Sequence, residues 1–526
     1  MNFLLRTTSV LAIAAAVAGC DTPIPQALAP KYVPSNFTAP TAIAAQTWPS
    51  PDWWKGFGSD ELNGFIATAQ TENLDLAAAT ARVLQAEAQS EIAGSALFPT
   101  LNLEGTAQRS RNGTGGIVTN AQNQIIGTKS STTNAFGLLL NATYELDIWG
   151  KARNNLRAAD ELVKASTYAQ QVVALTVTSD VGTTYLDVLA LRERLDIARQ
   201  NVDAAKRILA IVQAKVANGV SSRLDLAQQQ AQLASIEATI PALEEQEREA
   251  RYALAILLGR LPEGFDVTGK NLDGIITPTV APGMPSELLR RRPDVAQAEA
   301  DLASQHANVD AARAAFFPQI SLTGSAGFQS TSLSSLFTGP GFAWSFGANL
   351  LQTIFDGGLI EGQFELSKAQ QQELVATYRS TVLNAFSDVE TTLGQVSSLA
   401  DQERLKTEQV AASAEAFRIS ELQYREGVTD LLNLLTSQQT LFTAQDQLVQ
   451  IKLARIQADI GLYKALGGGW AEVADAATQA LPAQTTPVAP GPPASSPPKS
   501  TARVPATPNP APIQGNAPPT PTPPRR

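Results

Sequence analysis

Most of this chain is written twice, and the internal repeat constrains the possible folds more than any other feature. The offset between matching strings is 219 residues at Ala96 and Ala315 and 208 at Lys215 and Gln423, so one loop is longer in the first half. A period of this length indicates a duplicated domain rather than an array of short repeats. The matching strings are Ala96–Leu103 with Ala315–Leu322, Asp147–Gly150 with Ile354–Gly357, Lys215–Val220 with Gln423–Val428, and Leu257–Gly259 with Ala465–Gly467.

Each half begins with a pattern typical of an amphipathic helix followed by two strands. The helices are expected over residues 60–97 and 293–317, where Pro99 and Pro318 would stop them because proline cannot continue a helix. In the strands, apolar residues occupy every second position. These positions are Phe136, Leu138, Leu140, Ala142, Tyr144, Leu146 and Ile148 in the first half, and Ile320, Leu322, Gly324, Ala326, Phe328, Phe342, Trp344, Phe346, Ala348 and Leu350 in the second.

This alternation, with aromatic residues near the strand ends, is typical of strands that present one face to lipid and the other to a polar lumen. A soluble hairpin with one face on a core gives the same pattern, so the strands alone leave both interpretations open. Residues 109–133 and 329–341 are rich in Gly, Ser, Thr and Asn and are expected to be long surface loops between the strands.

A very long helix is predicted next in each half, over residues 151–218 and 359–426. Neither stretch contains proline and each has few glycines, and at 1.5 Å per residue such a helix would span about 100 Å. Apolar residues in the first of these helices are spaced alternately three and four apart, as in a coiled-coil seam. The seam consists of Leu195, Ala198, Val202, Ala205, Leu209, Val212 and Val216.

Shorter returning helices are expected over residues 224–258 and 431–466, with Pro241 kinking the first of them. Glycines should turn the chain before each returning helix and end the helix after it. The turn glycines are Gly219 and Gly427, and the end glycines are Gly259 and Gly467. The first returning helix has its own seam of mostly small residues, which would allow close helix approach: Leu224, Ala227, Ala231, Ala234 and Ala238.

The composition excludes several functional classes. The net charge of −10 argues against a nucleic-acid binder, and a mean hydropathy of −0.06 with one long uncharged apolar stretch argues against a helical membrane protein. One Cys and one His cannot build a His/Cys zinc site. His306 is expected to be a surface or packed residue rather than a catalyst. Because common phosphate-binding, nucleophile and metalloprotease motifs are also absent, we predict no enzyme activity, no metal and no cofactor.

The N-terminus predicts a lipoprotein. A short positive segment ending at Arg6 precedes an apolar run that is too short to span a bilayer and suits a signal peptide. The run ends in Val17-Ala18-Gly19-Cys20, which resembles the bacterial lipobox, so Cys20 is expected to carry acyl chains that anchor the protein. A soluble secreted protein is the alternative. Asp21 resembles the enteric signal that retains lipoproteins at the inner membrane. This conflicts with the rest of the sequence, which favours the outer membrane.

The C-terminal part is rich in proline and has no acidic residue after position 482, so it is expected to be extended and disordered. These features predict the following domains: a lipoprotein signal peptide (1–19), an N-terminal segment (20–59), a first repeat (60–270), a connector (271–292), a second repeat (293–470) and a Pro-rich disordered tail (471–526).

Four strands cannot close a membrane barrel, because the smallest barrels have about eight strands. An open edge in lipid would leave backbone groups unpaired at several kcal/mol each. If the strands enter a membrane, the protein is therefore an oligomer, and three chains would supply a 12-stranded barrel. A soluble coiled-coil protein with two small hairpins is the alternative.

Three strings resemble the outer membrane efflux protein family, the TolC-like channels. They are Trp53–Leu62, Gly283–Val295 with its Arg290-Arg291-Arg292-Pro293-Asp294 core, and Phe317–Gly324. The second string is the most specific and resembles the NodT-like lipoprotein branch that serves resistance-nodulation-division pumps. The resemblance covers roughly residues 20–469 and leaves out the Pro-rich tail.

That resemblance implies a mainly α protein with transmembrane β-strands: a homotrimer whose 12-stranded outer-membrane β-barrel continues into a periplasmic α-barrel. It implies a passive duct for small amphiphilic compounds or drugs. Its helical tips would close the channel and open it when a periplasmic adaptor, joined to an inner-membrane pump, docks. A duct for type I protein secretion and a lipid-anchored structural coiled coil are the alternatives.

The two turns of this chain, each followed by an aspartate, resemble the family's helical tips. The tip and adaptor-contact candidates are Gly219, Val220, Asp225, Gly427, Val428 and Asp430. In a threefold assembly, a glutamate facing the axis would form a ring of three carboxylates that favours cations. Glu421 is the first candidate for this aperture, followed by Glu415 and Glu426. Salt links at the tips are expected to involve Arg223, Asp225 or Arg425, and the Arg290–Arg292 run is expected to form salt links beside its acidic neighbours.

Overall fold

The computed structural model describes residues 37–38, 49–112, 117–119, 121–122, 125–128, 131–278 and 285–470. The predicted signal peptide, Cys20, Asp21 and the Pro-rich tail lie outside these residues, as do Gly283 and Met284 of the connector string. All elements below belong to one compact unit.

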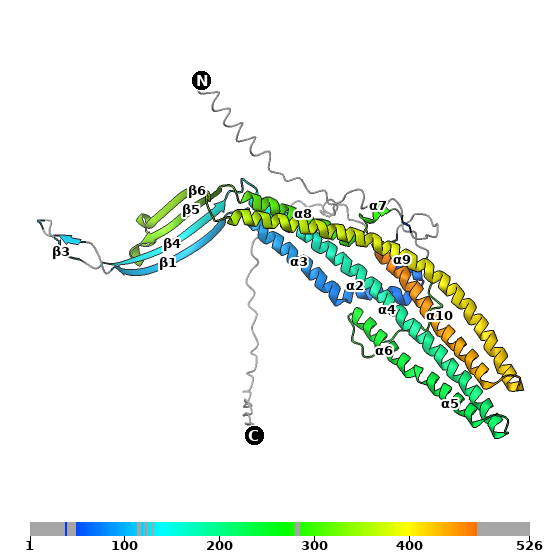
Figure 1. Cartoon of the computed structure of the whole chain (residues 1–526). Helices are drawn as coiled ribbons and strands as arrows, with labels where there is room; N and C mark the ends of the chain where they lie inside the picture. Colours follow the sequence, from blue (N-terminus) through cyan, green and yellow to red (C-terminus); the bar gives the residue numbers. More distant parts are fainter. Residues whose placement is uncertain are drawn as a thin grey trace, which may run out of the picture. The chain divides into compact units, whose positions relative to one another are not determined.

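Long helices dominate the described chain (Figure 1), and the two longest confirm the sequence-based prediction to within one residue at each end. Both begin after a glycine with positive φ, Gly150 and Gly358. The helices are η2 (Trp53–Phe57), α2 (Asp60–Glu72), α3 (Leu74–Ser95), α4 (Lys151–Ala217), α5 (Arg223–Glu237), α6 (Thr239–Leu257), α7 (Pro285–Leu288), α8 (Pro293–Ala314), α9 (Leu359–Glu426) and α10 (Leu431–Ala465).

The four predicted strands form one antiparallel sheet in the order β1-β4-β5-β6, so β1 and β6 are its edges. The register places the alternating apolar residues of all four strands on one face, because Leu103 pairs with Leu140, Leu140 with Ala326, and Ala326 with Trp344. We call this the apolar face. The strands are β1 (Thr100–Asn112), β4 (Ser131–Glu145), β5 (Gln319–Ser330) and β6 (Phe342–Leu351).

The loops between the strands carry more structure than the sequence predicted. Within the first expected loop, β1 and β4 extend farther than predicted, and β2 (Ile117–Thr119) pairs with β3 (Ile125–Thr128) as a separate hairpin. The second loop contains two short 3₁₀ turns, η3 (Leu333–Ser335) and η4 (Gly339–Gly341). The polar composition of these loops predicted the connections between the strands, but it did not predict the small hairpin or the 3₁₀ turns within them.

The prediction of one unbroken helix over residues 60–97 is wrong, because the chain breaks at Asn73. This residue has extended backbone, and its Oδ1 accepts a hydrogen bond from the Leu76 amide, which caps α3. Its Nδ2 donates to the Leu257 carbonyl at 2.8 Å. A buried amide therefore ties the end of α6 to the start of α3.

Arg292 makes the corresponding connection in the second half. It is the N-cap of α8, and its Nη1 donates to the Ala465 carbonyl at 3.1 Å, at the end of α10. Its Nη2 lies 2.7 Å from Asp294 and 3.0 Å from Asp388. The expectation that the Arg-rich connector forms salt links is therefore confirmed at this position.

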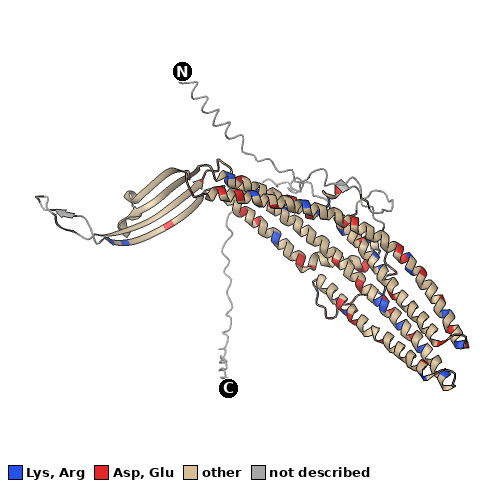
Figure 2. Cartoon of the chain, in the orientation of Figure 1, with Lys and Arg blue, Asp and Glu red and all other residues tan. Residues whose placement is uncertain are grey.

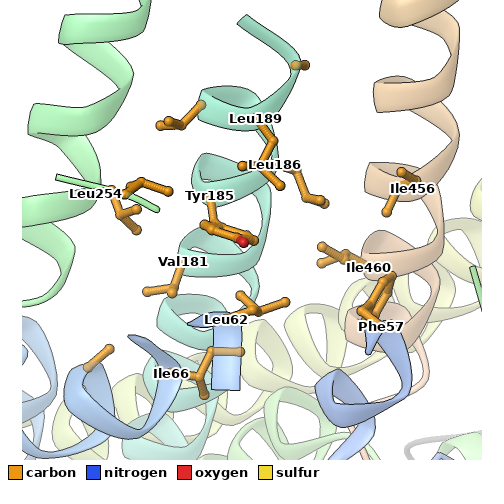
Figure 3. Close-up of a cluster of buried hydrophobic side chains, with 14 of the residues drawn as sticks. Phe57, Leu62, Ile66, Val181, Tyr185, Leu186, Leu189, Leu254, Ile456 and Ile460 are labelled. Atoms are coloured by element: carbon orange, nitrogen blue, oxygen red, sulfur yellow. The ribbon is translucent and has the colours of Figure 1, made fainter. Parts of the chain in front are cut away.

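The largest hydrophobic core lies where α4 meets the N-terminal helices, α6 and α10 (Figure 3). Tyr185 and Leu186 of α4 point into it beside Ile460 of α10. The η2 segment closes one side, where the ring of Trp53 stacks on Tyr463 with centroids 4.8 Å apart. This core holds the two halves of the repeat together, because it takes side chains from both.

α4 is the central helix, and α9 is the peripheral one. α4 packs against α2, α3, α5, α6, α8 and α10, whereas α9 packs chiefly against α8 and α10. The predicted seam on α4 is largely confirmed, with Leu209 and Val216 only half-buried and Ile208 fully buried beside it. Within the described chain, α4 alone is long and apolar enough to cross a membrane by composition, but half of that window is buried, as in a core helix.

The predicted seam on the first returning helix does not pack against the rest of the same chain. Leu224 is exposed, and so are the four alanines that follow it at the predicted spacing. The buried positions lie on another face, with Gln229 and Ile236 covered and Leu226 half-covered. The spacing correctly grouped residues on one face but could not identify the face that packs against the same chain. As predicted near Pro241, this helix is broken, at Ala238.

Candidate functional site

The candidate site consists of the two helical turns, one after α4 and one after α9, which we call the tips. At the first tip, Gly219 has a left-handed backbone with φ of 72°. The Val220 amide donates to the Lys215 carbonyl at 2.8 Å, and the Gly219 amide donates to the Val216 carbonyl at 3.0 Å. This pair of bonds is the Schellman motif, which satisfies the last carbonyls of a helix.

The second tip repeats the motif. Gly427 has φ of 79°, the Val428 amide donates to the Gln423 carbonyl at 2.8 Å, and the Gly427 amide donates to the Tyr424 carbonyl at 3.2 Å. A Cβ added at either turn glycine would meet no atom within 4 Å. The left-handed backbone, rather than crowding, therefore requires glycine at both tips.

The two aspartates predicted at the tips do not occupy equivalent positions. Asp430 is the N-cap of α10 and accepts from the Asn433 amide at 2.9 Å. Asp225 lies at the third position of α5, where it forms a capping box with Ser222. Hydrogen bonds from the Ser221 hydroxyl and then the Ser222 amide hold the pKa of Asp225 below its usual range. Both aspartates therefore stabilise helix starts.

Both tips expose apolar side chains at matching positions. Val220 and Leu224 are 72% and 65% exposed at the first tip, and Val428 and Leu432 are 74% and 64% exposed at the second. A Schellman motif commonly packs the residue after the glycine against the helix, but here both valines point away from it. Each tip therefore presents a small apolar surface.

A contact between Lys215 and Tyr424 joins the two tips, and sequence reasoning missed it. Lys215 Nζ donates to the Tyr424 carbonyl at 2.5 Å and lies 4.6 Å from the centroid of the Tyr424 ring. The tyrosine is buried, which raises the pKa of its hydroxyl. Neither Arg223 nor Arg425, which were predicted to form salt links, makes an ion pair with another residue that the structure describes.

The three predicted aperture glutamates all lie near the end of α9, in different surroundings. Glu415 is exposed and accepts two hydrogen bonds from Arg418, at 2.7 and 2.8 Å, which lower its pKa. Glu426 is exposed at the last position of the helix. Glu421 is half-buried and has no ion pair within the described part of the chain. Neither Glu421 nor Glu426 has a described cation as partner, and of these two carboxylates only Glu421 is half-buried.

The remaining candidates have structural roles. His306 is buried in α8, where its Nδ1 lies 3.0 Å from Gln371 Nε2, so it is a packed histidine as predicted. Its Nε2 lies 3.8 Å from Asp310. Among the described residues, no group of three or more His, Cys, Asp or Glu side chains could hold a metal ion.

A duplicated chain with two strand pairs, two helices of nearly equal great length and two Schellman tips defines the class of outer-membrane channels. The sequence model of the family described as "Outer membrane efflux protein" matches residues 65–260 and 284–468, one match in each half of the repeat. The chain belongs to this family.

Characterised relatives cover nearly the whole described region. The chain is 40% identical to the pyoverdine export outer membrane protein OpmQ of Pseudomonas aeruginosa, over 80% of this chain and 87% of the relative. It is 30% identical to the cation efflux system protein CusC of Escherichia coli K12, over 87% of this chain and 98% of the relative.

Solved structures agree with this assignment. The outer-membrane channel OprN superposes with a TM-score of 0.77 at 27% identity, covering 86% of this chain and 99% of OprN. The open state of the Neisseria gonorrhoeae MtrE outer membrane channel gives 0.74 at 29% identity, covering 85% and 98%. The chain is therefore an outer-membrane efflux protein with a channel fold.

Proposed function

We propose that this chain is the passive duct of a tripartite resistance-nodulation-division efflux system. Three copies would close a 12-stranded barrel in the outer membrane and continue it as a periplasmic α-barrel. The duct itself would perform no chemistry, and an inner-membrane pump would supply the energy through a periplasmic adaptor. The observation that carries the proposal is a four-stranded sheet with open edges and one apolar face, joined to long helices that end in two matched tips.

The exposed surfaces of a single chain support the oligomer. The apolar face of the sheet carries large exposed side chains, including Trp344 and Phe346, which are 73% and 71% exposed. The edges β1 and β6 leave backbone groups that another chain can pair. The exposed alanine stripe of α5 and the thinly covered α9 would then pack against neighbouring copies.

The tips are proposed as the gate and the adaptor contact. Val220 and Val428 provide apolar surface for a docking partner, while the capped helix starts hold the turns in shape. The contact between Lys215 and Tyr424 would hold the second tip against the first in the closed state. Three copies of Glu421 would then form the narrow ring, since this carboxylate is half-buried and has no described counter-ion.

Two further parts of the proposal rest on sequence. Cys20 is proposed to carry the lipid anchor, so that Cys20→Ser should abolish labelling by radioactive palmitate. The cargo is proposed to be small amphiphilic compounds or drugs. Because a relative at 40% identity is a pyoverdine export protein, pyoverdine-type export is the second candidate.

The first test is the mass of the detergent-extracted particle, corrected for bound detergent. A particle of three chains that conducts ions in planar bilayers is expected. A monomer, or a dimer that stays soluble without detergent once Cys20 is removed, would instead favour a structural coiled coil of the envelope. Export measured with an intact drug pump or with an ATP-driven protein exporter then separates drug efflux from type I secretion.

The second test addresses the tips. Gly427→Pro should cripple export while trimers remain in the membrane, because proline cannot adopt the positive φ of this turn. Gly427→Asn is the matched control, since asparagine tolerates left-handed backbone and should retain most export. Normal efflux from the proline variant at normal abundance would refute the assignment of this tip.

A further inference from the structure

The apolar face of the sheet has an unusual distribution of charge. Among the described side chains of the four long strands, only two charged residues lie on this face, and both are arginines near the end of β1. The carboxylates Glu104 and Glu145 lie on the opposite face, where they accept hydrogen bonds from Asn141 and Gln319. Along β1 the positions on the apolar face are Leu101, Leu103, Gly105, Ala107, Arg109 and Arg111.

The neighbours of these arginines are hydrogen-bonding residues without negative charge. Arg109 pairs across the sheet with Asn134, and Arg111 pairs with Thr132. Both arginine side chains are exposed. Two guanidinium groups, one amide and one hydroxyl therefore share one patch of the apolar face, and none of its residues supplies a carboxylate.

The patch lies at the end of the sheet that is farthest from the helices. β1 begins directly after α3, so its last residues are the most distant from the helices along the strand, and Figure 2 shows the basic colour there. With strands rising about 3.4 Å per residue and tilted by about 40°, Arg109 and Arg111 stand about 20 and 25 Å above Leu101. That height matches the outer boundary of an apolar band about 25 Å tall.

We propose that Arg109 and Arg111, with Asn134 and Thr132, form a binding site for the phosphate groups of a lipid in the outer leaflet, a phosphorylated glycolipid. The inference rests on the proposed function, because periplasmic helices are what make this end of the sheet face the outer leaflet. Guanidinium groups bind phosphate oxygens in pairs. Their stems lie along apolar surface while their heads reach the headgroup layer, and the acyl chains of the lipid would cover Ala107 and its cross-strand partner Phe136.

The site would also lie at the seam between chains. β1 is an edge strand, so closure of a barrel places its arginines beside the β6 edge of the next copy. One lipid per seam gives three bound molecules per trimer at saturation. Free phosphate lacks acyl chains to occupy the apolar surface and would bind this site far more weakly.

The test is a lipid titration of the full-length, delipidated protein in detergent, followed by native mass spectrometry. Diphosphoryl lipid A, a phosphate-free glycolipid of similar chain length, and inorganic phosphate are the probes. Wild type is expected to bind diphosphoryl lipid A selectively, with three molecules per particle. The double variant R109Q/R111Q should bind it at least tenfold more weakly, and each single variant about threefold more weakly, while binding of the phosphate-free lipid stays the same.

The matched control is R199Q/R404Q, which removes two exposed helical arginines and should bind like wild type. Equal binding of lipid A by R109Q/R111Q and wild type would overturn the inference, as would displacement of lipid A by millimolar inorganic phosphate. Particle mass and conductance are measured on the same preparations. A conducting wild-type trimer without arginine-dependent binding would refute only the lipid site, whereas a non-trimeric wild type would refute both proposals.

Discussion

The two halves of the chain have the same order of helices and strands, but equivalent elements make different packing contacts. In the first half, the long helix is enclosed by six others and its returning partner is broken into α5 and α6. In the second half, α9 is covered mainly by α8 and α10, and α10 is a single helix. The two halves therefore share the same backbone path. The long helix of the first half packs against more neighbouring helices than the long helix of the second half.

The two halves also differ at the junction between the end of the returning helix and the start of α3 or α8. Asn73 and Arg292 start equivalent helices, and each donates to the carbonyl at the end of the returning helix in its own half. The neutral amide closes one junction with one bond, whereas the guanidinium closes the other and also binds Asp294 and Asp388. The same geometric task is therefore done by a hydrogen bond in one half and by an ionic network in the other.

The largest expected effect is the loss of stability when a Cβ is added to the glycine at each junction. Gly259 and Gly467 both have positive φ, and a Cβ at either would overlap a backbone carbonyl, that of Glu72 or Arg291. Gly259→Ala and Gly467→Ala should each destabilise the protein by about 4 kcal/mol or more, because backbone strain and overlap add. Gly427→Ala, with the same φ but open space, should cost only about 1 kcal/mol. Denaturant unfolding of all three checks this, and equal costs would contradict it.

The next effect concerns two aligned positions at which the acidic and the basic residue are exchanged between the two halves. Glu247 and Arg251 of α6 align with Arg455 and Asp459 of α10. In the first half, Glu247 is bound by Arg192 at 2.9 Å and by Arg251 at 3.5 Å. In the second half Arg455 is bound by Glu403, which leaves Asp459 2% exposed with no hydrogen-bond partner for its Oδ2.

Burial raises the pKa of Asp459 from 3.8 to about 7, against a smaller opposing effect of Arg455. Between these values the folded protein holds a proton that the unfolded chain releases, so stability should fall as pH rises from 4 to 7. Asp459→Asn should remove this slope and stabilise the protein at pH 8 by on the order of 3 kcal/mol. Unfolding curves at pH 5 and pH 8 measure it. Asp203→Asn, at an exposed site on α4, should leave the slope unchanged.

A smaller effect separates the two junctions themselves. Arg292→Ala should cost about 2–3 kcal/mol, because it removes a charge-assisted network from a buried position. Asn73→Ala should cost about 1–2 kcal/mol, the usual value for an N-cap with one further bond. Urea unfolding of both variants distinguishes the ionic junction from the neutral one. An equal loss in both would show that the two partner aspartates contribute nothing.

The smallest effect should appear as function rather than stability. Lys215→Ala removes the donor to the Tyr424 carbonyl and the cation over its ring, contacts worth about 1 kcal/mol together. The second tip should then separate from the first more often, which would raise single-channel conductance without the adaptor. Lys206→Ala, which removes an exposed pair with Glu237, is the control. Unchanged conductance with Lys215→Ala would show that this contact does not hold the gate.

Much of this fold was predictable because its signals are local. Proline-free stretches bounded by glycine located α4 and α9, and alternation of apolar residues located the sheet and its apolar face. The break at Asn73 and the buried face of α5 were not predictable, because each depends on a partner far away in sequence. Gln229, for example, is fully buried and its amide donates to the Ala205 carbonyl at 3.0 Å, whereas glutamine is an exposed residue in most proteins.

The candidate site was predictable in outline but not in detail. The repeat located both turn glycines and the valines beside them, because the strings around them match. It also suggested that Asp225 and Asp430 were counterparts, whereas alignment by offset pairs Asp430 with Ser222. The contact between Lys215 and Tyr424 joins residues from different halves, and no local pattern signals such a pair.

The open edges of the sheet set an order of events for the life of this protein. A newly made chain can complete its helices alone, since their backbone bonds are internal to each helix. Its sheet cannot be completed alone, because no other strand in the described part of the chain pairs with the outer sides of β1 and β6, and lipid offers no hydrogen bonds in their place. Membrane insertion and assembly would therefore occur together. A single chain in the periplasm would have unpaired strand edges, which promote aggregation and proteolysis.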